Sequence, residues 1–288
     1  MTLYPINVGN FRLDGGAMFG VVPKALWNKT NPADEKNMID IASRCLLIED
    51  GARLILIDTG MGTKQSDKFF NFYYRWGNLS IEKALATVGF CKEDVTDVFL
   101  THLHFDHCGG CVEWNKGRSG YELAFKNATV WSNENHWDWA VKPNGREKAS
   151  FLSDNIIPIS ESGNLKFVPV PELDVLQGSE LGFDVFFANG HTDKQMIPII
   201  TYKGKTICFM ADLLPTVGHV PVAYVMGYDT RPLTTLKEKG AFLSFAEKND
   251  YVLFLEHDSV NECCTLKNTE KGVRLERSFD FNELFKNG

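Results

Sequence analysis

The sequence predicts an α/β fold, an αββα sandwich in which helices flank two mixed sheets, built as a single domain over residues 1–288. Strand-like runs bounded by turn residues dominate the first third of the chain. The second half again contains strand-like runs, with helices between some of them. No linker rich in Pro, Gly or Ser, no low-complexity tract and no short repeat divides the halves. Together these observations favour one layered domain.

The regular structure of the first half is expected to include a β-hairpin. Residues 43–49 and 54–58 are apolar and β-rich, and the Asp50-Gly51 pair between them is a strong hairpin signal. Ser80 is the expected N-cap of a helix that Gly89 ends. The other elements expected in this half are a strand over 97–101 and a Trp-rich helical region over 133–152.

The second half is expected to consist mainly of strands around one long helix. Apolar, β-rich runs predict strands over 183–188, 196–202, 205–210 and 251–256. A helix over 232–248 separates the last two strands, and the tail is expected to form another hairpin over 264–266 and 273–276. The chain is therefore composed of two β-rich halves.

The composition excludes several classes of protein. The formal net charge of −7 and the pI of about 5.5 disfavour nucleic acid as a partner, because an acidic surface repels phosphate backbones. No apolar run approaches the roughly 18 residues of a membrane span, and residues 1–7 lack the features of a secretory signal. Seven scattered cysteines favour reduced thiols over a disulfide framework. We therefore expect a cytoplasmic protein without a nucleic-acid or membrane partner.

A histidine-rich segment, His102-Leu103-His104-Phe105-Asp106-His107, directly follows the strand expected over 97–101. Residues two apart on extended backbone project to the same side, so His102 and His104 are placed to share one metal ion. Asp106 and His107, just beyond, are placed to turn toward a second ion. This dense His-x-His-x-Asp-His pattern is a specific signal for a metal centre.

Three further candidate ligands, His191, Asp212 and His257, each follow an expected strand. Loops at strand ends are where rigid scaffolds present functional residues. Imidazole and carboxylate ligands without thiolate suit zinc, although iron, manganese or cobalt would fit the same set. The sequence thus predicts a metal centre assembled from the ends of several strands.

These motifs resemble the metallo-β-lactamase superfamily, and the resemblance covers nearly the whole chain. Five motifs of that family occur in order: Asp58-Thr59-Gly60, the segment 102–107, Gly190-His191-Thr192, Ala211-Asp212 and His257. The resemblance implies the metallo-β-lactamase fold and a dinuclear hydrolase with two Zn²⁺ ions per chain.

The resemblance also implies a role for each ligand. Metal one would be bound by His102, His104 and His191, metal two by Asp106, His107 and His257, with Asp212 as the bridge between them. Asp58 would not bind a metal ion itself but would orient the ligand loop. Two Zn²⁺ ions against two carboxylates and a bridging hydroxide leave a net positive charge, which suits an anionic transition state.

Several histidines and cysteines lie outside the expected ligand set. His136, among tryptophans, is expected to be structural. His219 lies seven residues after Asp212, and both a pocket position and a structural position are open for it. Cys108 and Cys111 have the Cys-x₂-Cys spacing of zinc and redox sites, but no second pair exists. The glycines between them are expected to form the turn from the ligand loop into a helix.

Departures from family patterns exclude several groups. Periplasmic β-lactamases have a cysteine at the position of Asp212, flavodiiron proteins have Glu at the position of His104, and too few residues follow His257 for the second domain of glyoxalase II. The chain resembles the quorum-quenching N-acyl-homoserine lactonases of the YtnP type and, more distantly, the methyl parathion hydrolases. Residues 14–24 and 210–216 carry this closer resemblance.

The substrate pocket is expected to include Met18, Phe19, His219 and Tyr224. Some lactonases have a substrate-polarising tyrosine three residues after the bridging aspartate, where this chain has Pro215. Either metal one alone polarises the carbonyl, or Tyr224 or Tyr228 substitutes. The aromatic run 69–76 is a candidate wall for an acyl chain or aryl group, and a place in the core or in a homodimer interface is the alternative.

The resemblance implies hydrolysis of a small-molecule ester, with opening of N-acyl-homoserine lactones as the expected reaction. A metal-bridging hydroxide would attack the carbonyl, metal one would hold the carbonyl oxygen, metal two would receive the leaving alkoxide, and Asp106 would shuttle the proton. Phosphotriesters and thioesters are alternative substrates. A non-hydrolytic metal-binding protein or an oxidoreductase is the alternative from another class, against which the full ligand set and the lack of a flavin or haem motif argue.

Overall fold

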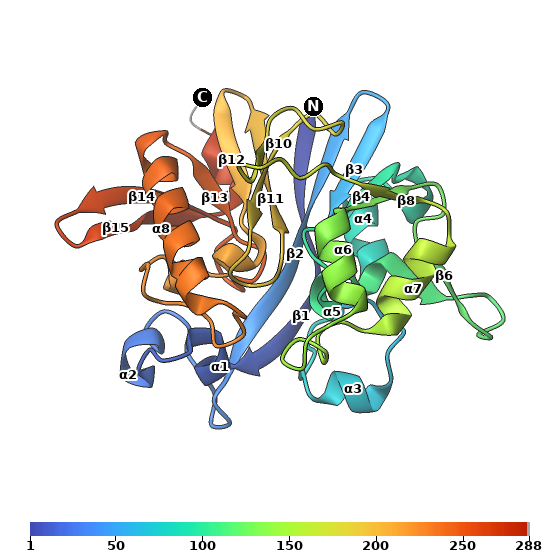
Figure 1. Ribbon diagram of the computed structural model, residues 1–288, viewed down its shortest axis with the longest axis horizontal. Helices are drawn as coiled ribbons and strands as arrows, with labels where there is room; N and C mark the ends of the chain where they lie inside the picture. Colours follow the sequence, from blue (N-terminus) through green and yellow to red (C-terminus); the bar gives the residue numbers. More distant parts are fainter. Residues whose placement is uncertain (287–288) are drawn as a thin grey trace. The chain divides into compact units, whose positions relative to one another are not determined.

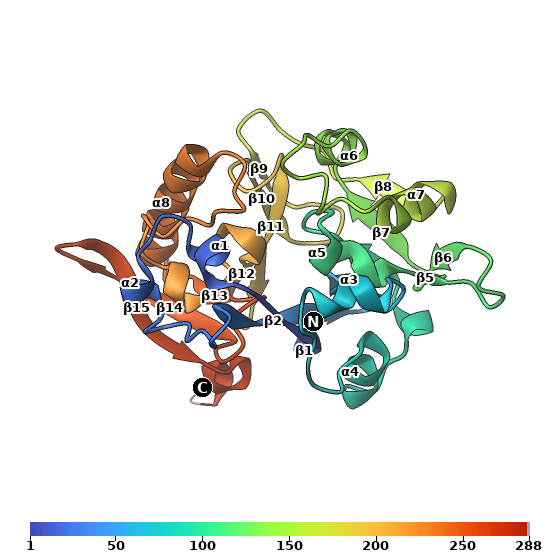
Figure 2. The same ribbon diagram turned by 90° about the horizontal axis from the view of Figure 1, so that it is seen from below.

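In the computed structural model, which describes residues 1–286, the chain divides into two compact units (Figures 1 and 2). The first unit comprises residues 1–10 and 43–176, and the second comprises residues 11–42 and 177 onward. Each unit carries a sheet, in agreement with the two β-rich halves of the sequence. Whether the two units together form the single domain expected over residues 1–288 is not decided by this division, and that expectation stays a prediction.

The first unit is built on a mixed sheet with strand order β1-β2-β3-β4-β7-β8. Its strands are β1 (Thr2–Asp14), β2 (Met38–Asp50), β3 (Arg53–Ile57), β4 (Asp97–Phe99), β7 (Thr129–Ser132) and β8 (Leu165–Phe167). β1 leaves the first unit after Asn10, and β2 enters it at Ser43. β2 and β3 form the predicted hairpin, in which Asp50 pairs with Arg53. β3, β4, β7 and β8 run parallel, so their carboxyl ends meet at one edge of the sheet.

Short helices surround this sheet. They are α3 (Asp67–Asn71), α4 (Ile81–Thr87), α5 (Phe105–Cys108), α6 (Glu134–Val141) and α7 (Ser153–Glu161), with 3₁₀ turns η1 (Lys92–Asp94) and η2 (Gly109–Cys111). Ser80 accepts a hydrogen bond from the Lys83 backbone N–H and so caps α4, as predicted. α7 contacts the β5–β6 hairpin (Val112–Trp114 and Tyr121–Leu123), and Figure 2 shows the two side by side.

The Trp-rich helix over 133–152 was predicted too long. α6 ends at Val141, because Pro143 disfavours the helical conformation of the residue before it and Gly145 follows closely. Residues 142–152 instead form an irregular segment that leads into α7. This segment supplies side chains to the surroundings of the ligand loop, as described below.

Apolar side chains of the parallel strands form the core of the first unit. Leu56, Val98 and Val130, from three neighbouring strands, are fully buried and belong to one cluster with Leu85 of α4 and Ile159 of α7. Full burial of each such side chain contributes roughly 1.5–3 kcal/mol relative to exposure. The packing therefore fixes the end of β4, from which the histidine-rich segment continues.

The second unit contains a sheet with strand order β15-β14-β13-β12-β11-β10, and the two-residue strand β9 (Val175–Leu176) lies at the end of the first unit. Its strands are β10 (Asp184–Ala188), β11 (Gln195–Tyr202), β12 (Lys205–Phe209), β13 (Val252–Phe254), β14 (Cys263–Thr269) and β15 (Gly272–Phe279). β12 and β13 run parallel, and the other neighbouring pairs run antiparallel. All the strands predicted for this half are present, and the tail hairpin is longer than the pattern indicated.

One long helix covers part of this sheet. α8 (Pro232–Lys248) coincides with the predicted helix and packs on β14 and β15 (Figure 1). The unit also contains α1 (Gly15–Phe19), α2 (Lys24–Trp27) and the 3₁₀ turns η3 (Ala211–Leu213), η4 (Val217–His219) and η5 (Phe281–Phe285). Within residues 1–286, no helix is long and apolar enough to cross a membrane.

The cysteines are free thiols, and all of them lie in the described part of the chain. Cys91 is exposed and the other six are buried. Burial raises the pKa of Cys108 to about 12, so this thiol stays protonated. A Cβ on Gly109 would lie 2.3 Å from the carbonyl oxygen of Met61, which only glycine permits. The glycines of this Cys-x₂-Cys segment therefore serve close backbone packing at the turn, as expected.

Candidate metal centre

The predicted histidine-rich segment follows the carboxyl end of β4 in the first unit. The backbone N–H of Leu100 donates to Trp131 O at 3.0 Å, which extends the sheet one residue beyond β4 before the chain turns into α5 at Phe105. The candidate ligands His102, His104, Asp106 and His107 are at most 8% exposed. Four ionisable side chains are thus buried together at an edge where parallel strands end.

Asp58, which directly follows β3, hydrogen-bonds to this segment at three points. Its Oδ1 accepts from the backbone N–H of Thr101 at 2.8 Å, and its Oδ2 accepts from the Thr101 hydroxyl at 2.6 Å and from His107 Nδ1 at 3.0 Å. Asp58 has a φ of 58°, a left-handed conformation that Asp adopts more readily than most residues. Because Nδ1 of His107 donates to a carboxylate, its Nε2 keeps a lone pair.

The rings of His102 and His104 meet edge to face, with their centroids 4.5 Å apart and an angle of 78° between their planes. The Thr101 hydroxyl donates its proton to Asp58, so it accepts from His102 Nδ1 at 3.1 Å. His102 Nε2 therefore keeps a lone pair, and it lies 3.1 Å from Nδ1 of His104. The ring of His107 is also close, with its centroid 3.9 Å from that of His102. Three imidazoles at these separations are well placed to bind cations.

His136 contributes to this arrangement through the backbone. It is fully buried in α6, and its Nε2 accepts from the Leu103 N–H at 2.8 Å, between two candidate ligands. Phe151 packs against His104 and His136, with ring centroids 4.7 and 5.8 Å apart. His136 is structural, as predicted, and it holds the ligand loop.

In the second unit, Asp212 contacts two of the predicted ligands. Its Oδ2 lies 3.0 Å from Nε2 of His191, and its Oδ1 lies 3.2 Å from Nε2 of His257. Each of the three follows its strand closely: β10 precedes His191, β12 precedes Asp212 and β13 precedes His257. Gly190 is required beside His191, because a Cβ there would lie 2.1 Å from the Thr235 hydroxyl of α8.

The other nitrogens of these two histidines have acceptors. His191 Nδ1 lies 2.9 Å from Oδ1 of Asp229, and His257 Nδ1 lies 2.8 Å from the carbonyl oxygen of Ala42. Both rings therefore donate from Nδ1 and direct Nε2 at Asp212. Burial lowers the pKa of His191, but Asp212 and Asp229 outweigh burial and raise the pKa to about 10. The Nε2 face of His191 is thus a strongly favoured place for a positive charge.

The residues expected in the substrate pocket, Met18, Phe19, His219 and Tyr224, lie in the second unit. Phe19 is fully buried between Trp27 and His219, with ring centroids 5.2 and 4.2 Å away. His219 Nε2 donates to Met18 O at 2.9 Å, and its Nδ1 lies 2.8 Å from the Thr216 hydroxyl. Burial lowers the pKa of His219 to about 3, so this ring is neutral and ties α1 to η4. Substrate contact by the four residues stays a prediction.

The aromatic run over 69–76 has a buried part and an exposed part. The rings of Tyr73 and Phe69 lie 4.8 and 5.3 Å from that of Phe105, the residue before Asp106. Burial and the charge of Asp106 raise the pKa of Tyr73 to about 12, so it remains a neutral phenol. Phe72, in contrast, is 66% exposed. The run therefore places apolar rings directly beside the ligand segment.

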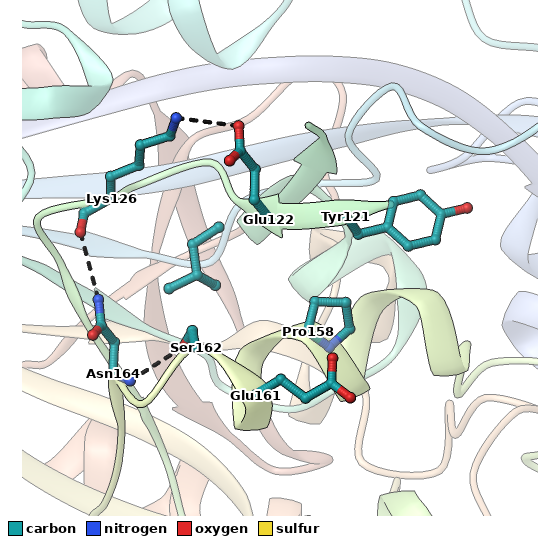
Figure 3. A pocket seen from close by; sticks show the side chains of 8 residues that line it. Tyr121, Glu122, Lys126, Pro158, Glu161, Ser162 and Asn164 are labelled. Carbon is teal, nitrogen blue, oxygen red and sulfur yellow. Dashed lines mark hydrogen bonds and ion pairs between the residues drawn. The ribbon is translucent and has the colours of Figure 1, made fainter. Parts of the chain in front are cut away.

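A hollow of about 360 Å³ lies elsewhere on the first unit, between β6 and the end of α7 (Figure 3). Its rim includes the Glu122–Lys126 ion pair at 3.1 Å and Asn164, whose side chain donates to Lys126 O at 3.5 Å. None of the candidate ligands lines it. It is therefore separate from the ligand loop.

The candidate ligands belong to groups of His and Asp side chains whose ligand atoms lie close enough together to hold a divalent metal ion. Three of the five histidines donate Nδ1 to a carboxylate or backbone carbonyl and a fourth donates it to a hydroxyl, so Nε2 is the ring nitrogen that would bind a cation. Sequence reasoning missed Asp229 and the Ala42 carbonyl as partners of these rings. No local pattern marks either one, because each contact joins residues far apart in the chain.

Comparison with known proteins agrees with this geometry. Residues 39–257 match the Metallo-beta-lactamase superfamily. An N-acyl homoserine lactonase of Bacillus cereus is 24% identical over 242 residues, which cover 78% of this chain and 85% of the relative. A probable metal-dependent hydrolase from Staphylococcus aureus superposes with a TM-score of 0.83 at 26% identity, covering 96% of both chains. AidC, a dizinc quorum-quenching lactonase solved with a product, superposes with a TM-score of 0.74 at 23% identity, covering 96% of this chain and 94% of AidC.

The match spans more than half of the chain and includes the five motifs that carried the resemblance to the superfamily in the sequence. The predicted fold class is confirmed: two mixed sheets with flanking helices, in the metallo-β-lactamase fold. The chain belongs to the metallo-β-lactamase superfamily and is a metal-dependent hydrolase of that family.

Proposed function

We propose that the protein is a dinuclear, zinc-dependent lactonase that opens N-acyl-homoserine lactones. The observation that carries the proposal is the orientation of the histidine rings within each unit. In the second unit, two Nε2 atoms face the two oxygens of Asp212 at 3.0 and 3.2 Å. A single carboxylate with one imidazole on each oxygen is suited to bridge two cations.

The proposed ligand groups follow the family pattern. Metal one takes His102, His104 and His191, metal two takes Asp106, His107 and His257, and Asp212 is shared. Neutral imidazoles and carboxylates favour zinc among the common divalent ions, and iron, manganese and cobalt remain compatible with the set. The dizinc relative AidC supports zinc for this fold.

When bound, the two ions would lower the pKa of a water molecule and polarise an ester carbonyl. The chain's own carboxylates hold the ligand rings in place and offset part of the positive charge of the ions. Asp58 holds His107, and Asp229 holds His191, each through an Nδ1–H hydrogen bond. Asp106, which is 8% exposed, is proposed to hold the proton that passes to the leaving alkoxide.

The substrate class is supported by relatives and by the aromatic rings. Curated relatives are named N-acyl homoserine lactonases. Phe69, Tyr73 and Phe105 form an apolar cluster next to Asp106, which suits an acyl chain or a comparable apolar group. Opening such lactones would make the protein quorum-quenching. Free cysteines suit a reducing compartment, and we place the activity in the cytoplasm.

The test is a side-by-side panel of substrates on zinc-loaded protein: acyl-homoserine lactones, a paraoxon-like phosphotriester, a thioester and a β-lactam. We expect the lactones to give the highest kcat/KM, and elemental analysis to give close to two ions per chain. Asp106→Asn should lose turnover, whereas Asp138→Asn, an exposed aspartate on α6, should not. Turnover of phosphotriesters or thioesters without any lactone would overturn the substrate class, and full activity with one ion would overturn the dinuclear centre.

A further inference from the structure

The five candidate histidine ligands do not all use the same ring nitrogen. His102, His107, His191 and His257 each have Nδ1 next to an oxygen atom of the protein. His104 is reversed, because its Nδ1 is the atom that lies 3.1 Å from Nε2 of His102. If Nδ1 of His104 binds the metal, Nε2 must carry the proton, and that proton needs an acceptor on the other side of the ring.

Glu147 is placed on that side. Its Oε1 lies 3.5 Å from Nε2 of His104, and the two side chains are 3% and 8% exposed. Both residues belong to the first unit, in which Phe151 also packs on the His104 ring. A buried carboxylate this close to an imidazole attracts the N–H strongly, since little water is present to screen the pair.

The orientation of Glu147 is fixed by its other oxygen. Oε2 accepts from Trp139 Nε1 at 2.7 Å and from the Asn144 side chain at 2.5 Å, so Oε1 is the oxygen that faces His104. The segment is also tied to the ligand loop through the backbone, because Phe105 N–H donates to Ser150 O at 3.0 Å and Ser150 N–H donates to Glu147 O at 2.7 Å. Two side-chain donors and a backbone connection thus hold one carboxylate beside one ligand.

We infer that Glu147 is the positioning residue for His104: its carboxylate accepts the Nε2 proton and thereby presents the Nδ1 lone pair to the metal. The inference rests on the proposed function, because it takes His104 as a ligand. Glu147 acts through His104 and does not touch the substrate. A carboxylate in this role fixes the ring tautomer and raises the basicity of the ligating nitrogen.

The first measurement needs no variant. In zinc-loaded protein with ¹⁵N-labelled histidine, two-bond ¹H–¹⁵N correlations should show His104 protonated at Nε2, while the other four ligands are protonated at Nδ1. A His104 ring protonated at Nδ1 would overturn the inference. If the protein binds no zinc at all, the proposed function itself fails, and the two failures are therefore distinguishable.

The second measurement separates positioning from mere support of the segment. Glu147→Gln removes the charge and keeps the shape, and Trp139→Phe removes a hydrogen bond from the same carboxylate and keeps the charge. By chelator competition with Co²⁺, we expect Glu147→Gln to lose affinity by about 10- to 100-fold, with a changed visible absorption spectrum, and Trp139→Phe to lose much less. Equal losses in both variants, or an unchanged affinity in Glu147→Gln, would show that Glu147 only supports the segment.

Discussion

Nδ1 of His191 lies 2.9 Å from Oδ1 of Asp229, a residue 38 positions further along the chain. Both side chains are buried, at 3% and 1% exposure. The hydrogen bond fixes the ring so that Nε2 points at Asp212. One aspartate that is not a predicted ligand therefore determines how a predicted ligand is presented.

Asp229→Asn should weaken metal binding without removing any ligand. Asparagine keeps the shape but loses the charge that favours the Nδ1–H tautomer of His191, and we expect a loss of affinity of about 10- to 100-fold. Chelator competition on the purified variant measures this. Asp250→Asn, an exposed aspartate at the turn after α8, is the matched control and should bind as the wild type does. An affinity for Asp229→Asn within twofold of that control would contradict the role.

Asp212→Asn should have a larger effect. It removes the charge that faces two imidazole Nε2 atoms at once, so we expect partial loss of metal and a fall in kcat of at least about 10²-fold. Elemental analysis and steady-state kinetics on the same preparation give both quantities. A variant with near-normal turnover and two ions per chain would show that Asp212 is not the bridge.

The sequence pointed to the candidate ligands but not to most of the residues that hydrogen-bond to them. His191, Asp212 and His257 were recognisable because each follows a strand that its own apolar pattern predicts. Asp229 and Glu147 were not, since each acts across many residues and lies in no motif. The long N-terminal strand β1 was also not predicted, and the helix after Asn133 was predicted too long because the effect of Pro143 was overlooked. Local sequence patterns therefore predict the helices, the strands and the residues at strand ends. The residues that hold the candidate ligands in place depend on tertiary contacts, which no local pattern reveals.

A buried lysine predicts a pH dependence of stability. Lys239 in α8 is 1% exposed and donates to the carbonyl oxygens of His219 at 3.1 Å and Tyr224 at 2.6 Å. Burial lowers the pKa of Lys239 to about 8, below the 10.5 expected in the unfolded chain. Between these two pH values the unfolded chain binds a proton that the folded chain does not, so the contribution of Lys239 to the free energy of unfolding rises with pH.

The measurement is denaturant unfolding of wild type and Lys239→Met between pH 7.5 and 10.5, both loaded with metal. We expect the difference in unfolding free energy, wild type minus variant, to rise by up to about 3 kcal/mol across that range. A difference that stays flat with pH would mean that Lys239 is not desolvated in the folded protein.

The aromatic cluster predicts how activity depends on acyl-chain length. If Phe69 and Tyr73 bind the chain, kcat/KM for lactones should increase with each added methylene, which contributes at most about 0.8 kcal/mol, until the pocket is full. Phe69→Ala and Tyr73→Ala should flatten that dependence and leave short-chain lactones little affected. Phe72→Ala, at an exposed position of the same run, is the control. If kcat/KM rises equally with chain length in all three variants, the acyl chain binds elsewhere in the protein.

The distribution of the cysteines has a practical consequence for following this protein in solution. Six thiols are buried and Cys91, which follows α4, is exposed, so a thiol-directed fluorophore or spin label would attach at one known place in the native sequence. No cysteine would have to be replaced, and the candidate metal centre would keep all of its natural surroundings. Hydrogen bonding to Asp94 raises the pKa of the Cys91 thiol, and mildly alkaline buffer would therefore speed the coupling.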